Sequence, residues 1–82
     1  MRLDKYLKVS RIIKRRTVAN EACDSAKVEA NGRVVKASYN VKVGDVLTLT
    51  FGSKSLKVEV TEVAEHKSKD DAGSMYRVIE QS

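Results

Sequence analysis

The spacing of apolar residues changes near residue 26, and this change limits the folds open to the chain. Before it, apolar residues recur as on one face of a helix, and after it they alternate with polar residues as on a strand. The predicted order is therefore helices followed by strands. We expect one domain over residues 1–82 of the α+β class, with two N-terminal helices packed on a small, mostly antiparallel sheet.

The first helical segment is amphipathic. On a helix its apolar side chains fall within an arc of roughly 100°, with lysines on the opposite side. The apolar residues are Leu3, Tyr6 and Leu7, and the lysines are Lys5 and Lys8. The aliphatic pair Ile12 and Ile13 follows and is expected to anchor in the core. A disordered basic tail would not carry so many aliphatic residues, so the segment is predicted to dock on the fold.

The second helical segment is predicted over Thr17 to Ala26. Its apolar side comprises Val18, Ala19, Ala22, Cys23 and Ala26. Thr17 is the expected N-cap. Arg15 and Arg16 would then lie at the entrance of the helix, where backbone N–H groups and the helix dipole also favour a phosphate.

Turn signals divide the rest of the chain into short strands. Asn31-Gly32 lies between two short alternating runs and predicts a hairpin. Lys42 to Asp45 is a second predicted turn, in which Asp45 bonds the nearby backbone. A strand is expected over Val46 to Phe51, and additional strands are expected over 54–63 and 75–79. The polar stretch 66–74 is predicted to be a mobile loop.

The positive charge is concentrated at the N-terminus. Residues 1–16 carry seven Lys or Arg against Asp4 alone, whereas residues 17–82 carry nine against ten Asp or Glu. Such asymmetry is typical of a protein with a polyanionic partner, because each cation that neutralises a phosphate releases condensed counterions. The alternative is a solvated basic tail, which the aliphatic residues among the charges disfavour.

Single residues with reactive side chains do not form a catalytic set. The lone Cys23 cannot form an internal disulfide and is expected in the core, and His66 has no Cys or His at ligand spacing. Tyr6 is expected in the core with base stacking as the alternative, and Tyr39 is the better stacking candidate. No enzyme, metal or cofactor is predicted. The N-terminus has no apolar run typical of a signal peptide or membrane span, so a cytoplasmic location is expected.

Five short motifs occur in a specific order over about residues 1–50. They are Arg2-Leu3-Asp4-x-x-Leu7, Ser10-Arg11, Arg15-Arg16-x-x-Ala19, Val28-x-x-Asn31-Gly32 and Val43-Gly44-Asp45. Together they resemble the S4 domain, an RNA-binding fold named after a small-subunit ribosomal protein. The resemblance implies a core motif over about residues 1–50. It also implies an RNA surface made by Arg2, Asp4, Lys8, Arg11, Lys14, Arg15 and Arg16, to which Lys5 is added as a further candidate.

Within this family, the run MRLDKYLKVSRIIKRR is similar to the RqcP group of small stand-alone bacterial members. This likeness implies a role in ribosome-associated quality control. The implied partners are 23S rRNA of the large ribosomal subunit, P-site peptidyl-tRNA and an RqcH-like protein that delivers alanyl-tRNA for alanine tailing. The chain would be ribosome-associated, and a monomer when free. The neutral to acidic end at Ser82 favours this group over the related heat-shock protein 15, which generally carries a longer basic extension.

Three other functions remain open at this point. Through its relation to heat-shock protein 15, the chain could be a factor that recycles large subunits carrying nascent chains. The chain could present RNA as an accessory subunit of a modifying enzyme, or it could be a protein adaptor that uses its sheet. Strong salt dependence would favour RNA binding over the adaptor.

Two positions in the motif are unusual. Asp4 is an acid among cations: it could orient Arg11 or Arg16, accept a hydrogen bond from a ribose hydroxyl, or support Lys8 on the helix surface. Ala26 stands where many family members have glycine, at the end of the second helix. A left-handed alanine there would cost on the order of 1 kcal/mol.

Overall fold

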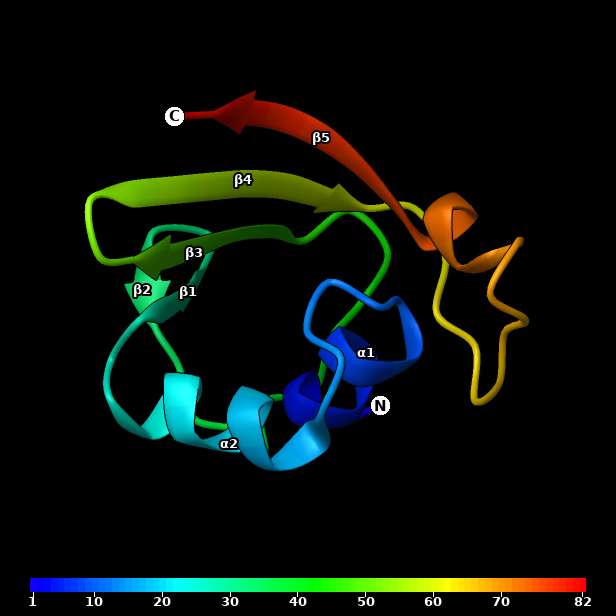
Figure 1. The fold of residues 1–82 in the computed structure, drawn as a ribbon, viewed down its shortest axis with the longest axis horizontal. Coiled ribbons are helices and arrows are strands. Elements are labelled where there is room, and N and C mark those ends of the chain that lie inside the picture. Colours follow the sequence, from blue (N-terminus) through cyan, green and yellow to red (C-terminus); the bar gives the residue numbers. More distant parts are fainter.

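A layer of two helices covers one side of a five-stranded sheet. The computed structural model describes residues 1–82. Helix α1 spans Leu3–Val9 and helix α2 spans Arg16–Asp24. Both lie below the sheet in Figure 1. Neither helix has the length and apolar character needed to cross a membrane.

The sheet is antiparallel throughout, with strand order β2-β1-β3-β4-β5. Its strands are β1 (Val28–Ala30), β2 (Arg33–Val34), β3 (Val46–Phe51), β4 (Lys54–Val60) and β5 (Tyr76–Gln81). The predicted α+β class, two helices on a small antiparallel sheet, is confirmed. The sheet is open, and β2 and β5 form its edges.

The predicted Asn-Gly hairpin is also confirmed. Asn31 and Gly32 have φ angles of 54° and 83° and join β1 to β2. Two positive φ angles in succession match the right-handed twist of the strands that such a turn connects. The Asn31 side chain then bonds across to β3, because its Oδ1 accepts from the Val46 backbone N–H at 2.9 Å.

The short helix α1 is held at its N-terminus by residues far along the chain. The backbone N–H of Leu3 donates to the Tyr39 carbonyl at 2.8 Å, and that of Asp4 donates to the Ala37 carbonyl at 3.2 Å. The Lys5 N–H donates to the Asp4 carboxylate at 2.8 Å. These bonds satisfy donors that a helix end leaves without partners. A helix of seven residues is too short to be stable alone, so such contacts position it.

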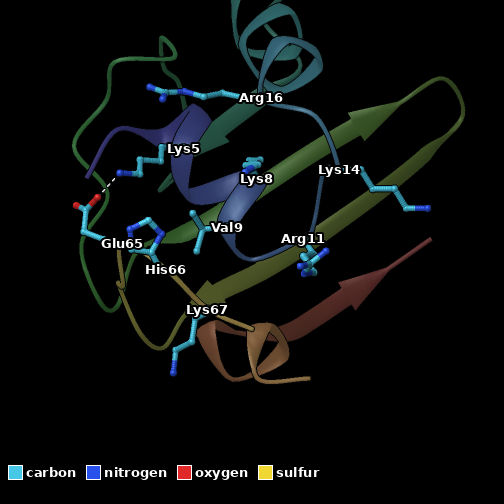
Figure 2. A pocket seen from close by; sticks show the side chains of 9 residues that line it. All are labelled: Lys5, Lys8, Val9, Arg11, Lys14, Arg16, Glu65, His66 and Lys67. Atoms are coloured by element: carbon cyan, nitrogen blue, oxygen red, sulfur yellow. Dashed lines mark hydrogen bonds and ion pairs between the residues drawn. The ribbon is translucent and has the colours of Figure 1, made fainter. Parts of the chain in front are cut away.

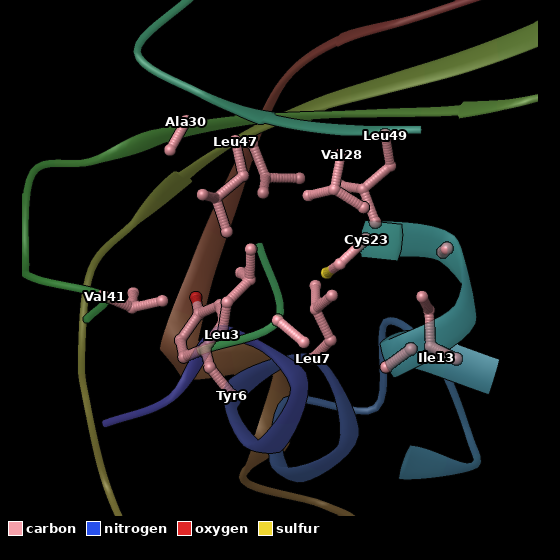
Figure 3. Close-up of a cluster of buried hydrophobic side chains, with 14 of the residues drawn as sticks. Leu3, Tyr6, Leu7, Ile13, Cys23, Val28, Ala30, Val41, Leu47 and Leu49 are labelled. Carbon is pink, nitrogen blue, oxygen red and sulfur yellow. The ribbon is translucent and has the colours of Figure 1, made fainter. Parts of the chain in front are cut away.

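The core lies between the helices and the sheet (Figure 3). Leu3, Tyr6 and Leu7 from α1 are fully buried and face Leu47 and Leu49 of β3. The predicted core position of Tyr6 is confirmed. Its hydroxyl donates to the Met75 carbonyl at 2.7 Å, which ties α1 to the C-terminal part of the chain.

The second helix differs from its prediction at both ends. It begins at Arg16 with Arg15 as N-cap, and no side chain caps it, so the prediction of Thr17 as N-cap is wrong. It ends at Asp24, and Ala26 lies beyond it in the left-handed region with φ 59°. Val18 is 44% exposed rather than buried. Only the narrower stripe of Ala19, Ala22 and Cys23 faces the core. The small side chains of this stripe let the helix pack close to the core.

The C-terminal third differs in its boundaries. Strand β4 ends at Val60 rather than at residue 63, and β5 runs over Tyr76–Gln81 rather than 75–79. The stretch predicted as a loop ends in a 3-10 helix, η1 (Ala72–Met75). Ala72 and Met75 of η1 are buried, so this polar stretch is fixed to the core at its end.

Candidate nucleic-acid interface

Basic side chains from four parts of the chain surround one hollow of about 360 Å³ (Figure 2). They come from α1, from the connection between the helices, from the first turn of α2, and from the connection between β4 and η1. The lining residues are Lys5, Lys8, Val9, Arg11, Lys14, Arg16, Glu65, His66 and Lys67. Small-molecule pockets are lined mainly by apolar side chains. This hollow has one apolar residue, Val9, and therefore suits a polyanion better.

Asp4 organises the arginines beside this hollow. Its carboxylate accepts from Arg2 through Nε at 3.2 Å and Nη2 at 3.4 Å, and from Arg16 Nη2 at 3.4 Å. The Asp4 side chain is 4% exposed, whereas those of Arg2 and Arg16 are 53% and 48% exposed. The buried carboxylate thus holds two guanidinium groups at the surface. Of the predicted alternatives, the structure favours orientation of arginines, with Arg2 in the place that was predicted for Arg11.

Asn20 completes the shell of Asp4. Its amide donates to Asp4 Oδ2 at 3.3 Å. Burial opposes ionisation of Asp4, but the hydrogen bonds from Asn20, Arg2 and Arg16 outweigh it and lower the Asp4 pKa. Sequence reasoning missed Asn20, although its spacing of four residues from Arg16 on a helix places both side chains on one face.

Arg11 has a left-handed backbone, with φ 62°. It follows Ser10, the C-cap of α1, and its N–H donates to the Lys8 carbonyl at 3.0 Å. Glycine usually occupies this position after a helix because a side chain there costs energy. An arginine at this point directs a cation to the rim of the hollow, and strained backbone of this kind is concentrated at functional sites.

The structure brings together most of the predicted site residues. Lys5, Lys8, Arg11, Lys14 and Arg16 line the hollow, and Arg2 and Asp4 join them through Arg16. Arg15, the N-cap of α2, is exposed but does not line the hollow.

Sequence reasoning missed the segment Glu65 to Lys67, which closes the hollow on one side. Glu65 forms an ion pair with Lys5 Nζ, and hydrogen bonding to Lys5 lowers the Glu65 pKa. Lys67 pairs with Glu62 at 2.9 Å. The predictions had placed Lys67 in a mobile loop and had considered His66 only as a metal ligand. No periodicity connects these residues to α1, because they lie some 60 positions away along the chain.

The other candidate side chains have structural surroundings. Cys23 is 3% exposed, and burial raises the pKa of its thiol to about 11, which confirms its place in the core and keeps it protonated. The Tyr39 hydroxyl donates to Asp45 Oδ2 at 2.9 Å. Its ring is partly buried against the core, which disfavours base stacking.

The family model of the S4 domain matches residues 1–47. The chain belongs to the S4 domain family. The match covers all the predicted RNA-binding residues of α1, the helix connection and α2, as well as β1 and β2. It ends within β3, so the segment Glu65 to Lys67 lies outside the matched part of this S4 protein.

Relatives within the S4 family are similar over the whole chain. The RQC P-site tRNA stabilizing factor of Streptococcus pneumoniae is 50% identical over 82 residues, which are 100% of this chain and 93% of that protein. The factor of the same name from Bacillus subtilis is 48% identical over 81 residues, 99% of this chain and 94% of that one. The predicted likeness to this group is confirmed.

A solved structure supports the fold assignment. The trimeric structure of Vibrio cholerae heat shock protein 15 superimposes with a TM-score of 0.88 and 29% identity, covering 95% of this chain and 80% of that one. The predicted relation to heat-shock protein 15 is thereby confirmed as well.

Proposed function

We propose that this protein is an RNA-binding factor of ribosome-associated quality control that binds the large ribosomal subunit and stabilises tRNA in the P site. The observation that carries the proposal is the ring of cations around the hollow, in a chain half identical to factors named for P-site tRNA stabilisation. The protein then acts as a binding factor, without catalysis, in the cytoplasm.

The chemistry of the surface fits folded RNA. A-form RNA hides most base edges in a deep, narrow groove, so a small protein recognises its shape, phosphates and ribose hydroxyls. Lys5, Lys8 and Lys14 supply point charges for phosphates. Arg2 and Arg16 offer planar forks that can span two phosphate oxygens or stack on a base. Arg11 and Arg15 extend this surface at the helix connection.

Asp4 acts through its neighbours in this proposal. Its side chain is almost fully buried and accepts bonds from two arginines, an asparagine and a backbone N–H. Orientation before binding reduces the conformational entropy that the long arginine side chains lose on the RNA. Asp4 is therefore a positioning residue rather than a direct RNA contact.

The finer partners follow from the likeness to RqcP proteins. The RNA of the large subunit that this surface contacts is 23S rRNA, and the second contact is the P-site peptidyl-tRNA. An RqcH-like protein would use the stabilised tRNA for alanine tailing of the stalled nascent chain. Lys8 and Arg16 line the hollow, and Arg2 shares the Asp4 carboxylate with Arg16. Exposed cations at both places suit simultaneous contact with two RNA elements.

Sedimentation through a density gradient tests the proposal. Tagged protein should migrate with large subunits that carry peptidyl-tRNA and should remain at the top when the subunits lack tRNA. Arg16→Ala should reduce the bound fraction about tenfold with little change in melting temperature, because Arg16 is half exposed. Arg77→Ala is the matched control, since Arg77 pairs with Glu59 on the sheet. Wild-type protein that never migrates with large subunits would refute the function.

Recycling of large subunits that carry nascent chains is the second candidate. The close superposition of the fold favours it. Alanine tailing in a reconstituted system separates the two, because a tRNA-stabilising factor should increase tail length in the presence of an RqcH-like protein, whereas a recycling factor should not.

A further inference from the structure

The basic hollow contains a single carboxylate, that of Glu65. Its side chain is 65% exposed and forms an ion pair with Lys5 Nζ, as Figure 2 shows. An acid at this place lowers the positive potential that would attract RNA. The pair joins residues 60 positions apart, in a segment that the family match does not include.

The chain on both sides of Glu65 is fixed. Val63 and Ala64 pack against the core cluster, and the ion pair between Lys67 and Glu62 closes the segment on itself. The Glu62 backbone N–H also donates to the Met75 carbonyl at 3.2 Å. These contacts place Glu65 and His66 opposite α1, so the segment forms a stable wall of the hollow.

We propose that the edge of the hollow between Lys5 and the segment Glu65 to Lys67 is a subsite for an RNA backbone phosphate, and that the Glu65 carboxylate occupies it in the free protein. Carboxylate and phosphate oxygens accept the same hydrogen bonds from an ammonium group. A phosphate that displaces Glu65 would face Lys5 and Lys8 from α1 and His66 from the opposite wall. The identity of the ligand as RNA rests on the proposed function.

Displacement of Glu65 by a phosphate changes the number of ions that RNA binding releases. When a phosphate replaces Glu65 on Lys5, the freed carboxylate takes up solvent cations, so the wild-type protein releases fewer ions than a variant without Glu65. Neutralising one phosphate steepens the logarithmic salt dependence of binding by about 0.7 to 0.9. Glu65→Gln should therefore both tighten RNA binding and steepen its salt dependence.

Binding to a fluorescent 20-nucleotide RNA hairpin and to large subunits carrying peptidyl-tRNA tests this subsite. Glu65→Gln should tighten both by about two- to fivefold, the range for loss of an exposed ion pair. Glu59→Gln is the matched control, because it removes an equal charge and an ion pair with Arg77 on the sheet. In a Lys5→Gln background the effect of Glu65→Gln should fall below about twofold, since contacting residues are not additive.

Equal effects of Glu65→Gln and Glu59→Gln, or an undiminished effect without Lys5, would overturn the subsite. Inorganic phosphate should compete only weakly if the subsite belongs to an RNA strand, and competition as strong as that of the hairpin would assign it to free phosphate instead. Failure of the proposed function is distinguishable: the wild-type protein would then bind the hairpin but not the large subunits, while the comparison of Glu65 with Glu59 still holds.

Discussion

Burial opposes the charge of two carboxylates, Asp4 and Asp45, and different hydrogen-bond donors stabilise each of them. Asp4 accepts hydrogen bonds from Arg2, Arg16 and Asn20. Asp45 accepts from the Asn31 amide at 3.1 Å, the Tyr39 hydroxyl at 2.9 Å and the Lys42 backbone N–H at 3.0 Å. Burial opposes ionisation of both, and hydrogen bonds lower both pKa values.

The difference lies in where the donors point. The side-chain and backbone donors of Asp45 are neutral and belong to two connections of the sheet, the β1–β2 turn and the longer β2–β3 connection, so this carboxylate joins loops into one body. Two of the donors of Asp4 are cations that are half exposed. The same type of buried acid therefore stabilises the fold in one region and presents positive charge in the other.

The largest expected effect is the loss of stability when Asp45 is replaced. Asp45→Ala leaves the Asn31 amide, the Tyr39 hydroxyl and the Lys42 N–H without their acceptor, and should lower the free energy of unfolding by about 2 to 3 kcal/mol. Urea denaturation measures this loss. RNA affinity of the folded fraction should change less than about twofold. A variant that loses RNA binding while remaining stable would reverse the assignment of the two carboxylates.

Replacement of Asp4 should change RNA binding rather than stability. Asp4→Ala removes a negative charge from an RNA-binding face, which by net charge alone should tighten binding. We expect instead about fivefold to tenfold weaker binding to large subunits, because Arg2 and Arg16 must then be ordered by the RNA. Asp70→Ala, which removes an exposed charge, is the control in a binding titration. Tighter binding by Asp4→Ala would contradict the positioning role.

These contrasts show how far the sequence alone could predict the molecule. The change of apolar period and the Asn31-Gly32 turn predict the fold because both depend on local backbone preferences. The cluster of cations around α1 is likewise visible as a charge asymmetry. The arginine partners of Asp4 were predicted only in part, since Arg16 was among the predicted partners and Arg2 was not. The pairing with Arg16 depends on how the two helices pack, and Arg2 is held in place by a backbone bridge to Asn40, far along the chain.

The remaining features depend on the path of the chain in space. Glu65 meets Lys5 only because β4 and η1 bring the connecting segment back to α1. Arg11 in the left-handed region breaks the usual preference for glycine, and a pattern of residue types does not reveal it. Both features lie at the hollow, where local preferences and the requirements of binding differ.

The residues with left-handed backbone after the two helices differ in their place: one lines the hollow and the other does not. Arg11 and Ala26 have φ angles of 62° and 59°. Glycine at either position should raise the free energy of unfolding by about 1 kcal/mol, because it relieves the strain of a side chain. Arg11→Gly should also weaken RNA binding by about threefold, whereas Ala26→Gly should leave it unchanged. Thermal unfolding measures the stability of both variants, and the hairpin titration measures their RNA affinity. An equal loss of affinity in Arg11→Gly and Ala26→Gly would show that the Arg11 side chain does not contribute to RNA binding.

The smallest expected effect is the dependence of stability on acid. Because the pKa values of Asp4 and Asp45 are lowered in the folded protein, their contributions are complete above the unfolded value of about 3.9 and are lost as the pH falls through the folded values. Melting temperature should therefore decrease below about pH 4. Asp45→Asn and Asp4→Asn should each flatten this decrease.

Salt should separate the two contributions. The donors to Asp4 include two half-exposed guanidinium groups, so about 0.5 M NaCl should reduce the acid-sensitive part that Asp4→Asn removes. The part that Asp45→Asn removes should stay nearly constant, since neutral groups donate those bonds. Equal salt sensitivity of both parts, measured by melting curves between pH 2 and 5, would show that the cations around Asp4 contribute no more than neutral donors do.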